Sequence, residues 1–171
     1  MKNIIEFKNP DIALTPSIFD EVQRFGGKVM MTNENHPSGT DRCAEVASHF
    51  PDMDVVINIQ GDEPLVDYRQ LEQLIDAFIE PKTDIATLGN LSLTQEDVDN
   101  PNRIKVVVNA KNSALYFSRS AIPNSYHSKG NPLENYPYMR HIGLYAYRST
   151  VLQELTKLEP TALEKIESLE Q

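Results

Sequence analysis

The most chemically suggestive part of the sequence is VVINIQGDEP, at residues 55–64, where an apolar run ends abruptly in polar residues. Gly61 lacks a side chain, so a ligand can approach the backbone there. Pro64 favours an extended conformation for Glu63, so the two neighbouring carboxylates should diverge. Carboxylates beside a phosphate site are common Mg²⁺ ligands, since this ion takes one or two of them and fills its other positions with water and phosphate oxygens. The alternative interpretation is a polar turn with solvated acids, which these residue types favour slightly when taken alone.

A second candidate site is HPSGTDR, at residues 36–42, just before a predicted helix. Ser38, Gly39 and Thr40 supply hydroxyl groups and exposed backbone amides. These groups can cap the helix, or they can recognise the polar edge of a ligand. The residue types alone favour capping.

Two further places could hold an anionic or sugar-like ligand. Arg119 directly follows an apolar strand pattern, where a guanidinium can bind a carboxylate or phosphate with two parallel hydrogen bonds or can form a surface salt bridge. In a strand over residues 141–147, the side chains of His141, Tyr145 and Tyr147 share one face. That face is either a sugar or acid pocket or a half-exposed sheet edge, and the residues leave both interpretations open.

Composition excludes several classes of protein. The chain has 171 residues, enough for one domain with a sizeable core, and a net charge of −9 argues against nucleic-acid binding. No apolar run approaches the ~20 residues of a membrane span. The single cysteine, Cys43, cannot form an internal disulfide, and it lies on a predicted helix face where burial is favoured over a nucleophilic role. We therefore expect a cytoplasmic protein without membrane insertion.

The elements that must position these residues follow from hydrophobic periodicity and from capping patterns, including predicted capping boxes that begin at Asp67 and at Thr161. Helices are predicted over 19–25, from about 41, from 68 to before 81, in the acidic stretch 94–102, and from 149 and 161. Strands are predicted over 28–32, 54–60, 84–91, 103–108, 114–117 and 141–147. The early strands alternate with helices, which predicts an α/β fold whose central sheet is mixed, mostly parallel and covered by helices on both faces. In such sheets ligands bind beyond the carboxyl ends of the strands, where residues 60–64 lie.

Several segments, in this order, carry a resemblance to a known family: NHPSGTDRCAEV, VVINIQGDEPLV, NPNRIKVVVNAKNSALYFSRSAIP, MRHIGLYAYR and EPTALEKIESLEQ. Together they resemble the 3-deoxy-manno-octulosonate (KDO) cytidylyltransferases, or CMP-KDO synthetases, over residues 19–171. The resemblance implies a nucleotide-diphospho-sugar transferase-like, Rossmann-like fold, usually dimeric. It also implies the reaction of CTP with KDO to give CMP-KDO and pyrophosphate, in lipopolysaccharide biosynthesis.

The resemblance also implies roles for individual residues. Asp62 would ligate Mg²⁺, the expected cofactor, and Gln60 would touch the sugar, so both are assigned to catalysis. Ser38 and Gly39 would help to recognise the cytosine and ribose of the nucleotide. The KDO pocket would be lined by Arg119, His141, Tyr145, Glu170 and Gln171.

Two segments of the family pattern have no counterpart in this chain: an N-terminal phosphate-binding loop and a C-terminal segment with a second metal-binding aspartate. Residues 1–16 are atypical of the family. The expectation is a single nucleotidyltransferase domain over residues 1–171, incomplete at both ends. It is either an enzyme with CMP-KDO synthetase chemistry, forming a homodimer, or a catalytically inactive remnant that lacks the phosphate loop.

Overall fold

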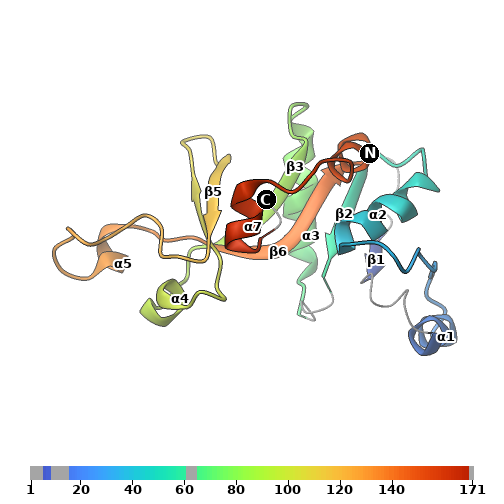
Figure 1. Ribbon diagram of the computed structural model, residues 1–171, viewed down its shortest axis with the longest axis horizontal. Coiled ribbons are helices and arrows are strands. Elements are labelled where there is room, and N and C mark those ends of the chain that lie inside the picture. The colour runs from blue at the N-terminus through green and yellow to red at the C-terminus, as the bar shows by residue number, and fades with distance from the viewer. Residues whose placement is uncertain (1–5, 9–15, 61–64, 170–171) are drawn as a thin grey trace. The chain divides into compact units, whose positions relative to one another are not determined.

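The computed structural model describes residues 6–8, 16–60 and 65–169 (Figure 1). The chain forms two compact units: the first unit comprises Met1–Thr87 and Gly143–Leu158, and the second unit Leu88–Ile142 and Glu159–Gln171. Strands β3 (Ile85–Asn90) and β6 (Arg140–Arg148) each begin in one unit and end in the other. The expectation of a single domain over residues 1–171 stays a prediction.

The strands of the first unit include β1 (Glu6–Lys8), β2 (Val55–Ile59) and the end of β6. β1 pairs with β2 in parallel, but β2 and β6 run antiparallel, as do the pairs that β4 (Lys105–Val108) forms in the second unit. The α/β class is confirmed, whereas the prediction of a mostly parallel sheet is wrong. Alternating strands and helices imply parallel pairing only where consecutive strands become neighbours. Here β2 instead pairs with a strand from much later in the chain.

Helices α2 (Gly39–Ser48) and α6 (Ser149–Leu155) pack against β2 and against each other. Their shared core consists of Cys43, Ala44, Ala47, Val56, Tyr147 and Leu152. All five residues of β2 are buried, so the strand is covered on both faces, as its Val and Ile content predicts. The burial of Cys43 confirms that it is a packing residue.

The remaining helices of the first unit are α1 (Pro16–Arg24) and α3 (Tyr68–Asp76), and α3 continues as a 3₁₀ turn over Ala77–Ile79. Asp67 and Gln70 form the predicted capping box at the start of α3. The strand predicted over 28–32 is wrong, because these residues form neither helix nor strand. Thr32, at the end of that segment, bonds to a side chain of α2 instead of lying in a strand ladder.

The second unit contains the antiparallel pair β4 (Lys105–Val108) and β5 (Ala114–Ser118), as predicted, with β6 on the other side of β4. Its helices are α4 (Gln95–Asp99), α5 (Pro132–Asn135) and α7 (Ala162–Glu167). The short helix α5 lies between residues 118 and 140, where the sequence predicts neither a helix nor a strand. Within the described part of the chain, no helix combines the length and apolar character needed to cross a membrane.

Candidate functional site

The end of β2 is where the sequence predicts the metal and sugar contacts. Gln60 is exposed directly after the buried strand. Asp62, the predicted magnesium ligand, lies in segment 61–64, outside the described residues. Across residues 6–8, 16–60 and 65–169, no three His, Cys, Asp or Glu side chains gather as a metal site. Magnesium binding by Asp62 therefore stays a prediction.

Ser38 caps the N-terminus of α2. Its hydroxyl oxygen accepts the N–H of Asp41 at 3.2 Å, and the hydroxyl donates to Asp41 Oδ2 at 2.6 Å. Helix capping, one of the two interpretations of this motif, is thus confirmed. Gly39 opens the helix, where the first backbone N–H groups have no partner within the helix itself. The role of Ser38 and Gly39 in nucleotide binding stays a prediction.

The segment before α2, residues 32–36, is held by a buried arginine of that helix. The Arg42 side chain donates to Thr32 Oγ1 at 3.0 Å, to the carbonyl oxygen of Asn33 at 2.8 Å and to that of Glu34 at 3.3 Å. Arg42 is only 6% exposed. Because one side chain binds three consecutive residues, it fixes the backbone of this segment relative to α2.

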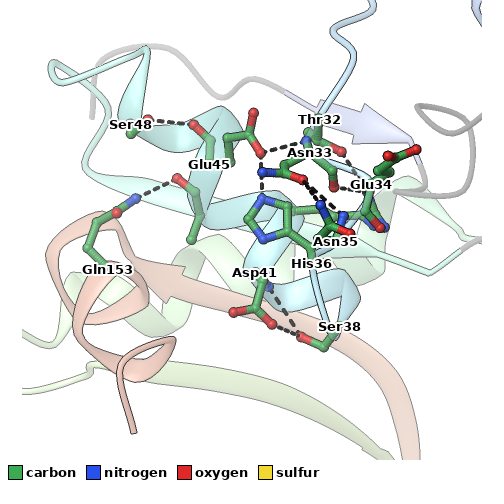
Figure 2. Close-up of polar contacts among 12 residues, drawn as sticks. Thr32, Asn33, Glu34, Asn35, His36, Ser38, Asp41, Glu45, Ser48 and Gln153 are labelled. Atoms are coloured by element: carbon green, nitrogen blue, oxygen red, sulfur yellow. Dashed lines mark hydrogen bonds and ion pairs between the residues drawn. The ribbon is translucent and has the colours of Figure 1, made fainter.

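Glu45, also on α2, holds the same segment from a second point (Figure 2). Its Oε2 accepts the backbone N–H of Asn33 at 2.9 Å and lies 2.5 Å from His36 Nε2. The Asn33 N–H and the His36 side chain hold the pKa of Glu45 below its ordinary value. The carboxylate is therefore ionised at neutral pH, and its contribution to stability is lost only as the pH falls through the lowered pKa.

We call residues 32–36 the tethered loop. Several backbone groups of this loop are already bonded within the protein, so the loop keeps its conformation without first having to be ordered by a ligand. Such preorganisation reduces the entropic cost of binding. The tethered loop and the N-terminus of α2 can therefore recognise the polar edges of a base or a ribose.

Tyr145 lies on the part of β6 that belongs to the first unit, opposite Asn58 of β2. Its ring stacks on that of Tyr147, with 6.0 Å between ring centroids, and it packs beside the core. Tyr147 is itself only 4% exposed. Tyr147 therefore serves the core, and the predicted ligand-facing surface of β6 does not extend to it.

Arg119 follows β5 in the second unit, and its side chain binds backbone carbonyls. Nε donates to the carbonyl oxygen of Glu167 at 2.6 Å, Nη2 to that of Ser168 at 2.9 Å and Nη1 to that of Pro101 at 3.3 Å. The sequence predicts a ligand contact or a surface salt bridge for Arg119, and neither describes these bonds. A contact with the sugar carboxylate stays a prediction.

His141 lies on the part of β6 that belongs to the second unit, and its ring meets that of Phe117 edge-on, with 5.0 Å between centroids. Burial lowers the pKa of His141 from 6.5 to about 4. The imidazole is therefore neutral at physiological pH. A neutral imidazole has one donor and one acceptor nitrogen and carries no charge. It is therefore better suited to bind sugar hydroxyl groups than to bind an anionic group.

The predicted site residues thus divide between the two units. The first unit holds Ser38, Gly39, Gln60 and Tyr145, and the second unit holds Arg119 and His141. Within the second unit, β5 and β6 both pair with β4, and Arg119 directly follows β5 while His141 lies on β6. Glu170 and Gln171 lie outside the described residues.

Comparison with known proteins assigns the chain to a protein family. A family model described as cytidylyltransferase matches residues 15–171. The chain belongs to the cytidylyltransferase family. The match runs through both compact units, so the predicted nucleotide residues and the predicted sugar residues all fall within it.

Individual relatives show which cytidylyltransferases this chain is similar to. The 3-deoxy-manno-octulosonate cytidylyltransferase of Fusobacterium nucleatum subsp. nucleatum is 46% identical over 155 residues, which are 90% of this chain and 61% of that protein. The protein of the same name from Bacteroides thetaiotaomicron is 48% identical, over 88% of this chain and 62% of the relative. A solved structure of CMP:2-keto-3-deoxy-manno-octonic acid synthetase complexed with CTP is 41% identical with a TM-score of 0.81, and the match covers 91% of this chain and 62% of that one. The chain thus spans about 60% of the length of these relatives.

Four residues that hold the predicted site residues in place were not predicted from the sequence: Arg42, Glu45, Lys105 and Glu167. Arg42 and Glu45 stand three positions apart on a predicted helix, so a shared helix face was a usable signal. Lys105 and Glu167 offered no such local signal, because their partners lie in other elements.

Proposed function

We propose that this chain acts in the transfer of CMP from CTP to 3-deoxy-manno-octulosonate, giving CMP-KDO and pyrophosphate for lipopolysaccharide biosynthesis. The observation that carries this proposal is the 46% identity, over 90% of the chain, with a relative named for that activity. The likeness of the fold to a synthetase complexed with CTP supports it.

In this proposal the tethered loop, Ser38 and Gly39 receive the nucleotide. The sugar is bound by Gln60, Arg119, His141, Tyr145, Glu170 and Gln171. The anomeric hydroxyl oxygen of the sugar attacks the α-phosphorus, its proton is lost to solvent or a base, and the bond to pyrophosphate breaks. The contribution of the protein is mainly alignment, since a bound hydroxyl held near the phosphorus reacts as part of one molecule.

We include Mg²⁺ in this proposal, held by Asp62 together with phosphate oxygens of CTP. The donor chemistry fits, because the acids follow an exposed strand end at Gln60 and Mg²⁺ prefers carboxylate and phosphate oxygens. When bound, the ion would neutralise charge on the phosphates. We also propose that the protein forms a homodimer and acts in the cytoplasm.

Pyrophosphate release tests the function directly. We expect this chain to release pyrophosphate only when CTP, KDO and Mg²⁺ are all present. The Asp62→Asn variant should lower the rate by about 100-fold or more, because it removes an anchor for charge stabilisation. Asp52→Asn, at an exposed acidic turn, is the matched control and should retain the wild-type rate.

Two results would contradict these assignments in different ways. A folded wild-type chain that releases no pyrophosphate would show the chain to be inactive by itself. Release that is unaffected by Asp62→Asn would remove the metal role from that residue and leave the reaction in place.

A further inference from the structure

The side chain of Glu167, at the end of α7, collects hydrogen bonds from β5 and from the residue after it. Its Oε1 accepts the hydroxyl groups of Tyr116 and Ser118, both at 2.7 Å. Its Oε2 accepts the backbone N–H of Arg119 at 3.1 Å. These donors hold the pKa of Glu167 below its ordinary value, with Ser118 contributing most. An ionised carboxylate therefore fastens the end of α7 to β5.

The side chain of Arg119 also attaches the end of α7 to the residue that follows β5. Its guanidinium donates to the carbonyl oxygens of Glu167 and Ser168, at the C-terminus of α7. The last carbonyls of a helix lack partners within the helix, and a cation there interacts favourably with the helix dipole. Ser168 has a left-handed backbone, with φ of 49°, so the Arg119 bond to its carbonyl supports a conformation that a non-glycine residue adopts at a cost.

A buried lysine fixes the backbone of Arg119. Lys105 is 0% exposed, and its Nζ donates to the carbonyl oxygen of Arg119 at 2.7 Å and to that of Asn100 at 2.9 Å. The Arg119 backbone is therefore held at its N–H by Glu167 and at its carbonyl by Lys105. We call these contacts of Glu167, Arg119 and Lys105 the α7 clamp.

Apolar packing does little to hold α7 in place. None of its residues is buried, and its apolar side chains Leu163 and Ile166 are 52% and 81% exposed. A helix of six residues is too short to be stable by itself in water. The polar contacts of the α7 clamp must therefore supply most of what keeps this helix on β5.

We propose that Glu167 is a positioning residue that sets the affinity of the protein for its anionic sugar by fixing the guanidinium of Arg119. The inference rests on the proposed function. Nη1 and Nη2 of Arg119 each carry a second N–H, and together these can donate to a carboxylate. A guanidinium already held by α7 binds that carboxylate without losing further side-chain freedom.

The test replaces Glu167 by glutamine, which keeps the size of the side chain and removes its charge and one acceptor oxygen. In ligand-free protein, hydrogen exchange over residues 162–169 should become at least about 10-fold faster, since charge-assisted hydrogen bonds are lost. The KM for KDO should rise about 10-fold, while kcat and the KM for CTP stay within about twofold. Tyr116→Phe, which removes one donor, should move both quantities less and in the same direction.

Glu159→Gln is the matched control at an exposed position of the second unit, and it should change neither quantity. Faster exchange in Glu167→Gln with an unchanged KM for KDO would overturn the positioning role. Unchanged exchange would overturn the α7 clamp itself. Because exchange is measured without ligand, a wild-type chain that shows no turnover would count against the proposed function and not against the clamp.

Discussion

Replacing Arg42 by alanine is expected to lower the free energy of unfolding of the first unit by about 3 kcal/mol and to weaken CTP binding. The wild-type side chain is buried and donates three hydrogen bonds to residues 32–34. Its removal takes a donor away from two carbonyl oxygens and a hydroxyl, and it leaves space inside the unit. Urea denaturation measures the free energy of unfolding, and hydrogen exchange over residues 32–48 measures the local stability of the tethered loop and α2.

Arg24→Ala is the matched control for this prediction. The Arg24 side chain is 73% exposed and forms an ion pair with Glu21 on the surface of α1. Exposed ion pairs of this kind contribute little to stability, so the control should unfold nearly as the wild type does. Equal losses in the two variants would show that Arg42 does not hold the tethered loop. A rise in the KM for CTP only in Arg42→Ala would link that loop to nucleotide binding.

Acidification from pH 6.5 to about 4 is expected to cost the second unit about 3 kcal/mol through His141 alone. Burial lowers the pKa of this imidazole in the folded chain from 6.5 to about 4. Between these values the unfolded chain binds a proton that the folded chain does not. Stability therefore falls as the pH falls through this range, and the loss is complete below the folded pKa.

The measurement is the free energy of unfolding against pH, with His141→Gln compared with the wild type. The variant has no imidazole to protonate, so its stability should depend less steeply on pH in this range. His127→Gln, at an exposed position of the same unit, should keep the steep dependence of the wild type. Parallel curves for His141→Gln and the wild type would mean that His141 is not the group responsible.

Much of the local structure of this cytidylyltransferase could be predicted from sequence. The capping boxes that begin at Asp67 and Thr161 form as predicted, because their donors and acceptors stand three residues apart. The two-sided burial of β2 follows from its composition, and the β4–β5 pair from two apolar runs joined by a polar turn. These features depend on residues that are close together in the chain, so they can be predicted directly from the sequence.

The family was also evident from sequence, because its motifs occur in a fixed order along the chain. The strand predicted over 28–32 failed for a physical reason that motifs do not reveal. Apolar residues there favour a strand, but Arg42 draws the polar groups at the end of the segment to α2. A tertiary contact thus outweighed a local preference.

Only the tertiary structure decided which strands pair and which side chains meet. β2 runs antiparallel to β6 because the chain returns to it from the opposite direction, and no local pattern encodes that return. The contact of Arg119 with Glu167 joins residues 48 positions apart. Arginine and glutamate are common surface residues, so their presence in the sequence does not indicate a structural role. Their role follows from the hydrogen-bond donors and acceptors that folding places around them. Such long-range contacts depend on the packing of whole elements, so residue spacing along the chain does not reveal them.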